Sequence, residues 1–216
     1  MSFILRLLLF VLPLLLIVGC SSPEPLNHEK TLNERDGVFY TKDTNKPYSG
    51  QVLSLYDDGK KKEEGTLNDG KKDGLFTFWY ENGQKSYEGN YKDGEYDGFW
   101  TEWYENGQKS YEGNYKDGKD DGLFTTWYEN GQKESESSSK DGELDGLWTT
   151  WYENGQLKGE YSYKDGKGVG TTKWFENGQL EEEQIYKDGE MQRWTTWDRN
   201  GQIRFELLYK NGELVF

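Results

Sequence analysis

Short segments rich in Trp, Tyr, Phe and Thr fill most of this chain, and turn-favouring dipeptides containing Gly separate them. The segments are nine to eleven residues long. Aromatic and β-branched residues favour strands. The chain contains no alanine, and Gly recurs too often for stable helices. The pattern therefore predicts an all-β fold, in which a continuous antiparallel meander has about two strands per repeat.

The segments belong to an internal repeat. Residues 79–94 recur letter for letter at 103–118, and the same pattern returns about seven times with a period of 23–24 residues. Each unit carries two turn signals, in most units one Asn-Gly and one Asp-Gly dipeptide, such as Asn82-Gly83 and Asp93-Gly94. Both dipeptides suit type I′ hairpin turns, which need positive φ at both central residues. Stacked hairpins can together bury an aromatic surface that one hairpin alone cannot bury.

Strand pairing across these turns predicts two different faces. Phe76 falls opposite Gly89 and Trp100 opposite Gly113, so on one face a ring covers the space above a glycine. The other face is mixed, with Thr77 near a tryptophan that recurs in every unit. We interpret this column as a possible ladder for binding a ligand or partner, with self-packing between repeats as the alternative; it consists of Trp79, Trp103, Trp127, Trp151, Trp174 and Trp197.

One unit departs from the repeat. Residues 132–139 read QKESESSS where QKSYEGNY is the pattern, so two tyrosines and the glycine are lost together. This irregular unit is predicted to be the least stable part of the array, because repeat stability is close to a sum over neighbours. The last two units are one residue shorter, which is typical of a terminal cap.

The first twenty residues predict export and lipidation. Arg6 precedes an apolar run from Leu7 to Val18, which is too short for an ordinary spanning helix of about 20 residues. The run ends in Ile17-Val18-Gly19-Cys20, which resembles a bacterial lipobox, so residues 1–19 are expected to be a signal peptide and Cys20 the lipidated residue. An ordinary secretory signal with a chance cysteine is the alternative. Cys20 is the only cysteine, so an intrachain disulfide is excluded.

Polar residues with two prolines follow the cysteine. Residues 20–36 are therefore expected to form a flexible tether, and residues 37–216 the repeat array. The only histidine, His28, lies in the predicted tether and is expected to be solvated.

Charge and chemistry exclude several functions. The net charge of −14 argues against nucleic acid as a partner. Without a second cysteine or histidine, neither a Ser-His-Asp or Cys-His arrangement nor a His/Cys zinc site can be assembled. Every acidic residue lies at a repeated, turn-adjacent or strand-surface position, whereas a catalytic pair should be a singular departure from the repeat. We therefore expect neither an enzyme, nor a metal site, nor a cofactor.

The motif YENGQxxxEGxYKDGxxDGxW resembles the bacterial variant of the MORN repeat, whose members are often labelled YwqK-type antitoxins. The resemblance covers roughly residues 37–216 and implies an elongated, single-layer β-sheet array. We predict a non-catalytic module for protein–protein interaction or scaffolding at the cell envelope, anchored to the membrane by lipid. Its protein partner stays unidentified. The alternatives are a glycan- or cell-wall-binding module and an antitoxin or immunity protein. Ser21 after Cys20 predicts the outer membrane if the cell is Gram-negative.

Overall fold

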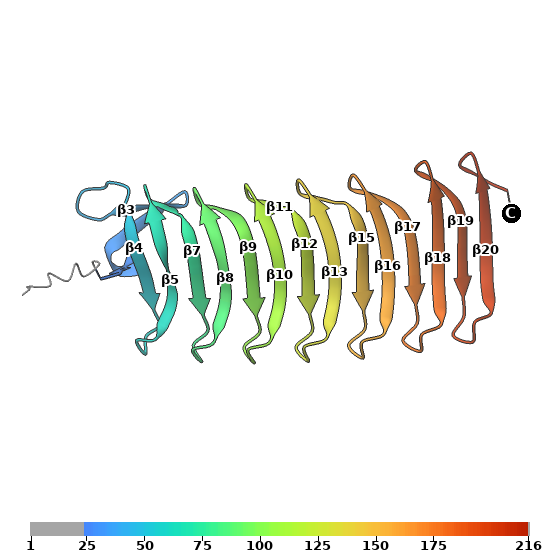
Figure 1. The fold of residues 1–216 in the computed structure, drawn as a ribbon, viewed down its shortest axis with the longest axis horizontal. Helices are drawn as coiled ribbons and strands as arrows, with labels where there is room; N and C mark the ends of the chain where they lie inside the picture. The colour runs from blue at the N-terminus through green and yellow to red at the C-terminus, as the bar shows by residue number, and fades with distance from the viewer. Residues whose placement is uncertain (1–23, 216) are drawn as a thin grey trace, which may run out of the picture.

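In a computed structural model that describes residues 24–215, the chain forms one long row of antiparallel strands in a single layer (Figure 1). The predicted all-β meander is confirmed. Seven hairpins follow one another, and each pairs with the next through its neighbouring strand. The hairpins are β4 (Gly50–Leu55) with β5 (Lys61–Asn68), β7 (Gly74–Trp79) with β8 (Lys85–Lys92), β9 (Glu95–Trp103) with β10 (Lys109–Lys116), β12 (Gly122–Trp127) with β13 (Lys133–Lys140), β15 (Gly146–Trp151) with β16 (Leu157–Lys164), β17 (Lys167–Trp174) with β18 (Leu180–Lys187), and β19 (Glu190–Trp197) with β20 (Ile203–Lys210).

The two turn dipeptides adopt different conformations. At Asp93-Gly94 both φ angles are positive, 53° and 89°, as a type I′ turn requires. At Asn82-Gly83 only the glycine has positive φ, and the loop is closed by a hydrogen bond from Gly83 N to Tyr80 O (2.9 Å). The predicted type I′ turn is therefore wrong at Asn82-Gly83 and at the five equivalent loops that contain Asn106, Asn130, Asn154, Asn177 and Asn200. Asn82 instead serves as a brace, because its Oδ1 accepts from Gln84 N and its Nδ2 donates to the next loop, each at 2.9 Å.

Short two-residue strands follow three Asp-Gly turns and the Asn211-Gly212 turn, and they extend the pairing of the preceding long strand. They are β6 (Lys71–Lys72), β11 (Lys119–Asp120), β14 (Glu143–Leu144) and β21 (Glu213–Leu214). In β9 the corresponding residues belong to one continuous strand.

Alternation along each strand separates the two faces as predicted. Phe76 pairs with Gly89, and Thr77 pairs with Glu88. We call the face that carries Phe76 and the equivalent rings the core face. The opposite face, which carries Thr77 and Trp79, is called the tryptophan face.

Rings cover glycines on the core face, but not the glycines that pairing alone suggested. A Cβ atom built on Gly89 would lie 2.0 Å from the Trp100 ring, and one on Gly113 would lie 2.4 Å from the Phe124 ring. Each ring therefore covers the glycine of the preceding hairpin, so Trp100 covers Gly89 and the predicted cover of Gly113 by Trp100 is wrong. Gly89 pairs with Phe76 on one side and with Trp100 on the other, so the strand register alone allowed either ring to cover it.

Residues 26–41 form a cap on the first hairpin rather than a tether. Strand β1 (Leu26–Asn27) pairs in parallel with β4, the short helix α1 (His28–Thr31) follows, and β2 (Leu32–Arg35) forms a hairpin with β3 (Val38–Thr41). The predicted flexible tether is thus wrong for residues 26–36. The predicted boundary at residue 37 also falls inside the turn of this hairpin, because Asp36 and Gly37 both have positive φ.

The cap is held by apolar packing and by ionic contacts of His28 and Glu29 with the first hairpin. Its buried cluster consists of Leu32, Phe39, Val52, Leu67 and Phe76. His28, predicted to be solvated, has a side chain only 11% exposed, and its Nε2 lies 3.0 Å from Glu63 Oε2. Across residues 24–215, no helix has the length and apolar character needed to cross a membrane.

Candidate functional site

The tryptophan column lies where the sequence predicted it, on one face of the sheet and at the ends of successive strands before the Asn-Gly loops. All six rings are half-buried, so neither the exposed ladder nor the fully self-packed column describes them. They are Trp79, Trp103, Trp127, Trp151, Trp174 and Trp197.

Lysine side chains cover the first four of these rings. Lys85 Nζ lies 5.8 Å from the centroid of Trp103, one repeat further on, and the same lysine pairs with Glu88. The distances at the equivalent positions of Trp79, Trp127 and Trp151 are 5.6, 5.9 and 5.8 Å. At an exposed site such a cation–π contact contributes about 0.5–1 kcal/mol. In the last two units leucine occupies the lysine position, at Leu157 and Leu180.

Tyrosine hydroxyls connect each of the first five hairpins to the next behind this column. The hydroxyl of Tyr80 donates to the carbonyl oxygen of Trp103 at 2.7 Å, and Tyr104 does the same to Trp127 at 2.6 Å. Burial raises the pKa of both phenols, so they remain donors at neutral pH. This repeated bond fixes the spacing of the tryptophans along the array.

A row of exposed apolar side chains also lies on the tryptophan face, two residues before Thr77 and the equivalent threonines. Leu75, Phe99, Leu123 and Leu147 are 53, 52, 57 and 49% exposed. Successive members are two strands apart, which is about 10 Å. We call this set the apolar row. The sequence contained the signal, a Leu or Phe after the same glycine in four units, but the prediction of the site used only the tryptophans.

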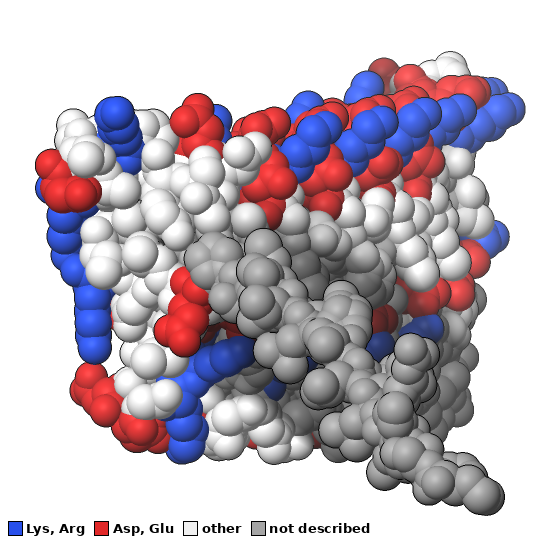
Figure 2. All heavy atoms as spheres, turned by 60° about the vertical axis from the view of Figure 1, so that its left-hand side comes forward, with Lys and Arg blue, Asp and Glu red and all other residues white. Residues whose placement is uncertain are grey.

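The edge formed by the Asp-Gly turns is highly charged. Adjacent rows of basic and acidic side chains run along this edge in Figure 2, where they alternate in sign. The exposed residues concerned are Lys92, Lys116, Lys140, Lys164 and Lys187, followed in each case by Asp93, Asp117, Asp141, Asp165 and Asp188. Mixed charge of this kind keeps an edge hydrated and offers no continuous positive track for phosphate groups.

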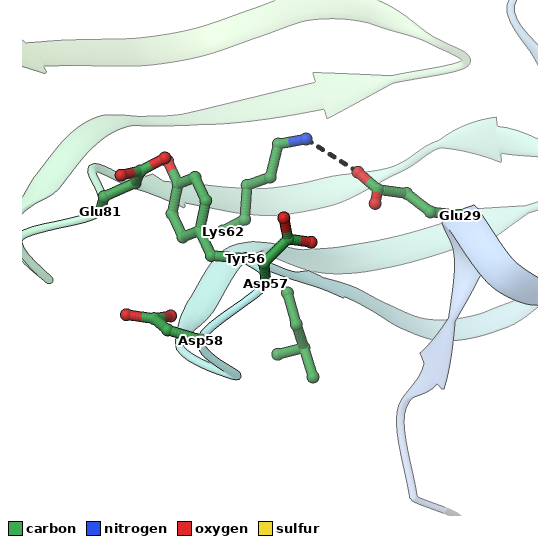
Figure 3. Close-up of a pocket in the computed structure, with 7 residues that line it drawn as sticks. Glu29, Tyr56, Asp57, Asp58, Lys62 and Glu81 are labelled. Carbon is green, nitrogen blue, oxygen red and sulfur yellow. Dashed lines mark hydrogen bonds and ion pairs between the residues drawn. The ribbon is translucent and has the colours of Figure 1, made fainter.

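A polar pocket of about 530 Å³ lies where the cap meets the first hairpin (Figure 3). Lys62 Nζ points away from Tyr56 and lies 2.9 Å from Glu29 Oε1, and this hydrogen bond raises the pKa of Lys62. Asp58 and Glu81 lie on the other side of the Tyr56 ring. Within residues 24–215 no three His, Cys, Asp or Glu side chains gather into a metal-binding group. The pocket thus fixes the cap to the array through Lys62 and Glu29.

A second pocket, of about 370 Å³, opens on the core face at the irregular unit. Ser135 stands here where the complete repeats have a tyrosine, and Trp148 of the next hairpin forms part of the wall. The sequence prediction treated this unit only as a weak point and not as a site. The predicted lipidation site, Cys20, lies outside the described residues.

Comparison with known proteins agrees with this architecture. The MORN repeat variant family matches six units, at residues 72–93, 96–117, 120–141, 144–165, 171–188 and 193–211, which together make up more than half of the chain. No curated protein matches the sequence. The hairpin β4–β5 precedes the first matched unit but pairs and packs like the others. The chain belongs to the MORN repeat variant family.

Proposed function

We propose that this protein is a membrane-anchored, non-catalytic interaction module whose tryptophan face binds a protein partner at the cell envelope. Repeats of this family generally serve protein or membrane interaction and are generally not enzymes. The apolar row is the observation that carries the proposal.

Four large apolar side chains in one line, each about half exposed, are unusual on a surface with so many charged residues. An apolar surface rimmed by polar groups is typical of a protein interface. Here the rim is supplied on the same face by Thr77 and the equivalent threonines, and by lysine–glutamate pairs such as Lys85–Glu88. A partner with apolar groups spaced about 10 Å apart would match the row.

The apolar row supports a protein partner more directly than the tryptophan column supports a glycan. Sugar rings stack on the open faces of aromatic side chains, but lysines already lie over four of the six tryptophan rings. The leucines and the phenylalanine have no such cover. We therefore propose the apolar row as the contact surface and the tryptophans as its structural support.

The proposal is tested by a photo-crosslinking amino acid placed at position 123 of the full chain in intact cells. We expect one discrete adduct that a protease destroys and a muramidase leaves intact. Phe99→Ser should abolish the adduct at position 123, because it removes the next member of the row. Ile203→Ser is the matched control, since Ile203 is equally exposed at 59% but lies outside the row. An adduct that survives Phe99→Ser, or that is sensitive to muramidase, contradicts the proposal.

The membrane anchor needs its own experiment. We expect Cys20→Ser to leave the signal peptide uncut and to abolish labelling by radioactive palmitate. Normal labelling of the Cys20→Ser protein would show that the lipobox resemblance is misleading.

A further inference from the structure

The irregular unit interrupts the row of rings on the core face. Ser135 pairs with Thr126 on one side and with Thr150 on the other, and Ser137 pairs with Phe124. In the two preceding units, the corresponding strands carry Tyr, Gly and Tyr on this face. Three serines therefore occupy positions where the repeat otherwise places two phenol rings and a covered glycine.

The complete units show what belongs at position 135. Tyr111, one repeat earlier, lies 6.1 Å from the Phe124 ring, and its hydroxyl lies 2.8 Å from the hydroxyl of Tyr115. Tyr87, two repeats earlier, lies 6.2 Å from the Trp100 ring. At both positions a phenol ring fills the space beside the large ring of the next hairpin.

The pocket of about 370 Å³ occupies this same space. Among its lining residues are Thr126 and Thr150, which are the two pairing partners of Ser135, and Trp148, which takes the place of Trp100 and Phe124. Its volume is at the lower end of the range for small-molecule sites, roughly 300–1,000 Å³. The cavity is therefore of a size suited to one aromatic group.

The polar groups of the pocket suit a ring that carries a hydroxyl. The hydroxyls of Ser135 and Thr126 lie 2.8 Å apart, and Thr126 Oγ1 lies 3.3 Å from a carboxylate oxygen of Glu134. Lys158 also lines the pocket. A phenol hydroxyl could thus donate to the carboxylate or accept from the ammonium group, while its ring packs on Trp148.

We propose that this pocket binds a tyrosine side chain presented by a partner polypeptide, which supplies the ring that the irregular unit lacks. The site lies on the core face, opposite the apolar row, and goes beyond the function proposed for the tryptophan face. An array with one contact surface on each side of a single-layer sheet can hold two proteins at once, as a scaffold does.

The test is a titration of the purified full chain with N-acetyltyrosine amide, followed by the indole N–H resonance of Trp148. We expect a saturable shift with a dissociation constant on the order of 1 mM, as a ligand of this size allows. N-acetylalanine amide should cause no shift. Ser135→Ala, which keeps the pocket open, should still give a saturable shift, whereas Ser135→Tyr should weaken binding about tenfold or more because its own ring fills the site.

Ser135→Phe provides a second filled variant in case Ser135→Tyr does not fold, and amide infrared spectra check the fold of each. A shift that persists unchanged in a folded filled variant, or no saturable shift in the natural chain, overturns the proposal. The titration uses no partner and reports on the core face alone. Its failure therefore leaves the crosslinking result at position 123 untouched, and the reverse also holds.

Discussion

Replacing Trp100 by alanine should destabilise the array more than any other single tryptophan change in the first three matched units. The Trp100 side chain is only 6% exposed and covers Gly89. Its ring centroid lies 4.6 Å from that of Tyr96, 5.9 Å from Tyr91 and 6.2 Å from Tyr87. Removal of a buried ring with so little room for collapse costs about 3–5 kcal/mol.

Trp103→Ala is the matched comparison, because it removes the same side chain three residues later on the opposite face. Trp103 is half-buried and partly covered by Lys85, so we expect a cost of about 1–2 kcal/mol from partial burial and the lost cation–π contact. The hydrogen bond from Tyr80 is retained, since it ends on a backbone oxygen that alanine also has.

Urea unfolding of the full chain, followed by amide infrared, gives the two midpoints. Because a repeat array can lose one region before the rest, hydrogen exchange in β8 and β9 should show that the damage from Trp100→Ala is local. A Trp103→Ala midpoint as low as that of Trp100→Ala, or lower, would mean that the two faces carry the opposite roles.

Three further predictions concern the contacts between units. Tyr104→Phe should cost about 0.5–1.5 kcal/mol in urea unfolding, because the next hairpin loses a hydrogen bond to a tryptophan carbonyl. An equal urea midpoint for the natural chain and Tyr104→Phe would show that water replaces the bond. Burial tends to raise the pKa of Glu63, but hydrogen bonds from His28 and from a lysine outweigh burial and lower it. The cap should therefore be fully held above the ordinary glutamate pKa of about 4.3 and should loosen as pH falls through the lower folded value, which hydrogen exchange in the cap can follow. Glu63→Gln should remove this acid dependence, and an unchanged profile would contradict it. Amides in residues 133–140 should exchange faster than those in 85–92, and equal rates would show that the lost rings do not weaken the array.

The sequence predicted the array well because its information is local and repeated. Asp93-Gly94 and its equivalents fix the tight turns, and the alternation within each strand then decides the two faces. The Asn-Gly loops were mispredicted because the loop between Tyr80 and Gln84 has three residues: Tyr80 N donates to Gln84 O, and Gly83 N donates to Tyr80 O. In such a loop only the last residue needs positive φ, and a rule based on the dipeptide does not include the loop length.

The cap could not be predicted by the same means. It occurs once, so no repeat reveals it, and its contacts are long-range: His28 meets Glu63, which lies 35 residues further along the chain. Leu26 and Leu32 are its only apolar residues before the turn at Asp36, and their surroundings are polar, as in a linker. Leu32 is buried and Leu26 partly buried because they pack against the first strand of the array, which contributes Val52.

The candidate surfaces were only partly visible in the sequence for a related reason. In a two-layer protein, Leu75 and Phe99 would be buried core residues. In a single-layer sheet the same residues are exposed, and their spacing in the sequence does not distinguish a two-layer fold from a single layer. Their exposure follows from the absence of a second layer over this face among the described residues (Figure 1). The pocket at Ser135 likewise needed the register, which shows that one serine stands between two threonines.

The hairpin after the irregular unit keeps the rule of one ring over one glycine but reverses its direction. In the next hairpin the order of ring and glycine is exchanged, so that Gly159 and Tyr161 stand where the pattern has tyrosine and glycine. A Cβ atom on Gly159 would lie 2.8 Å from the Tyr161 ring, so this glycine is covered from within its own strand. Trp148 cannot cover a glycine on the preceding strand, which has Ser137 instead, and its ring lies 5.0 Å from Tyr161 on the following strand. The changes in the two hairpins are therefore coupled: the ring that packs forward leaves space behind it, and that space is the pocket at Ser135.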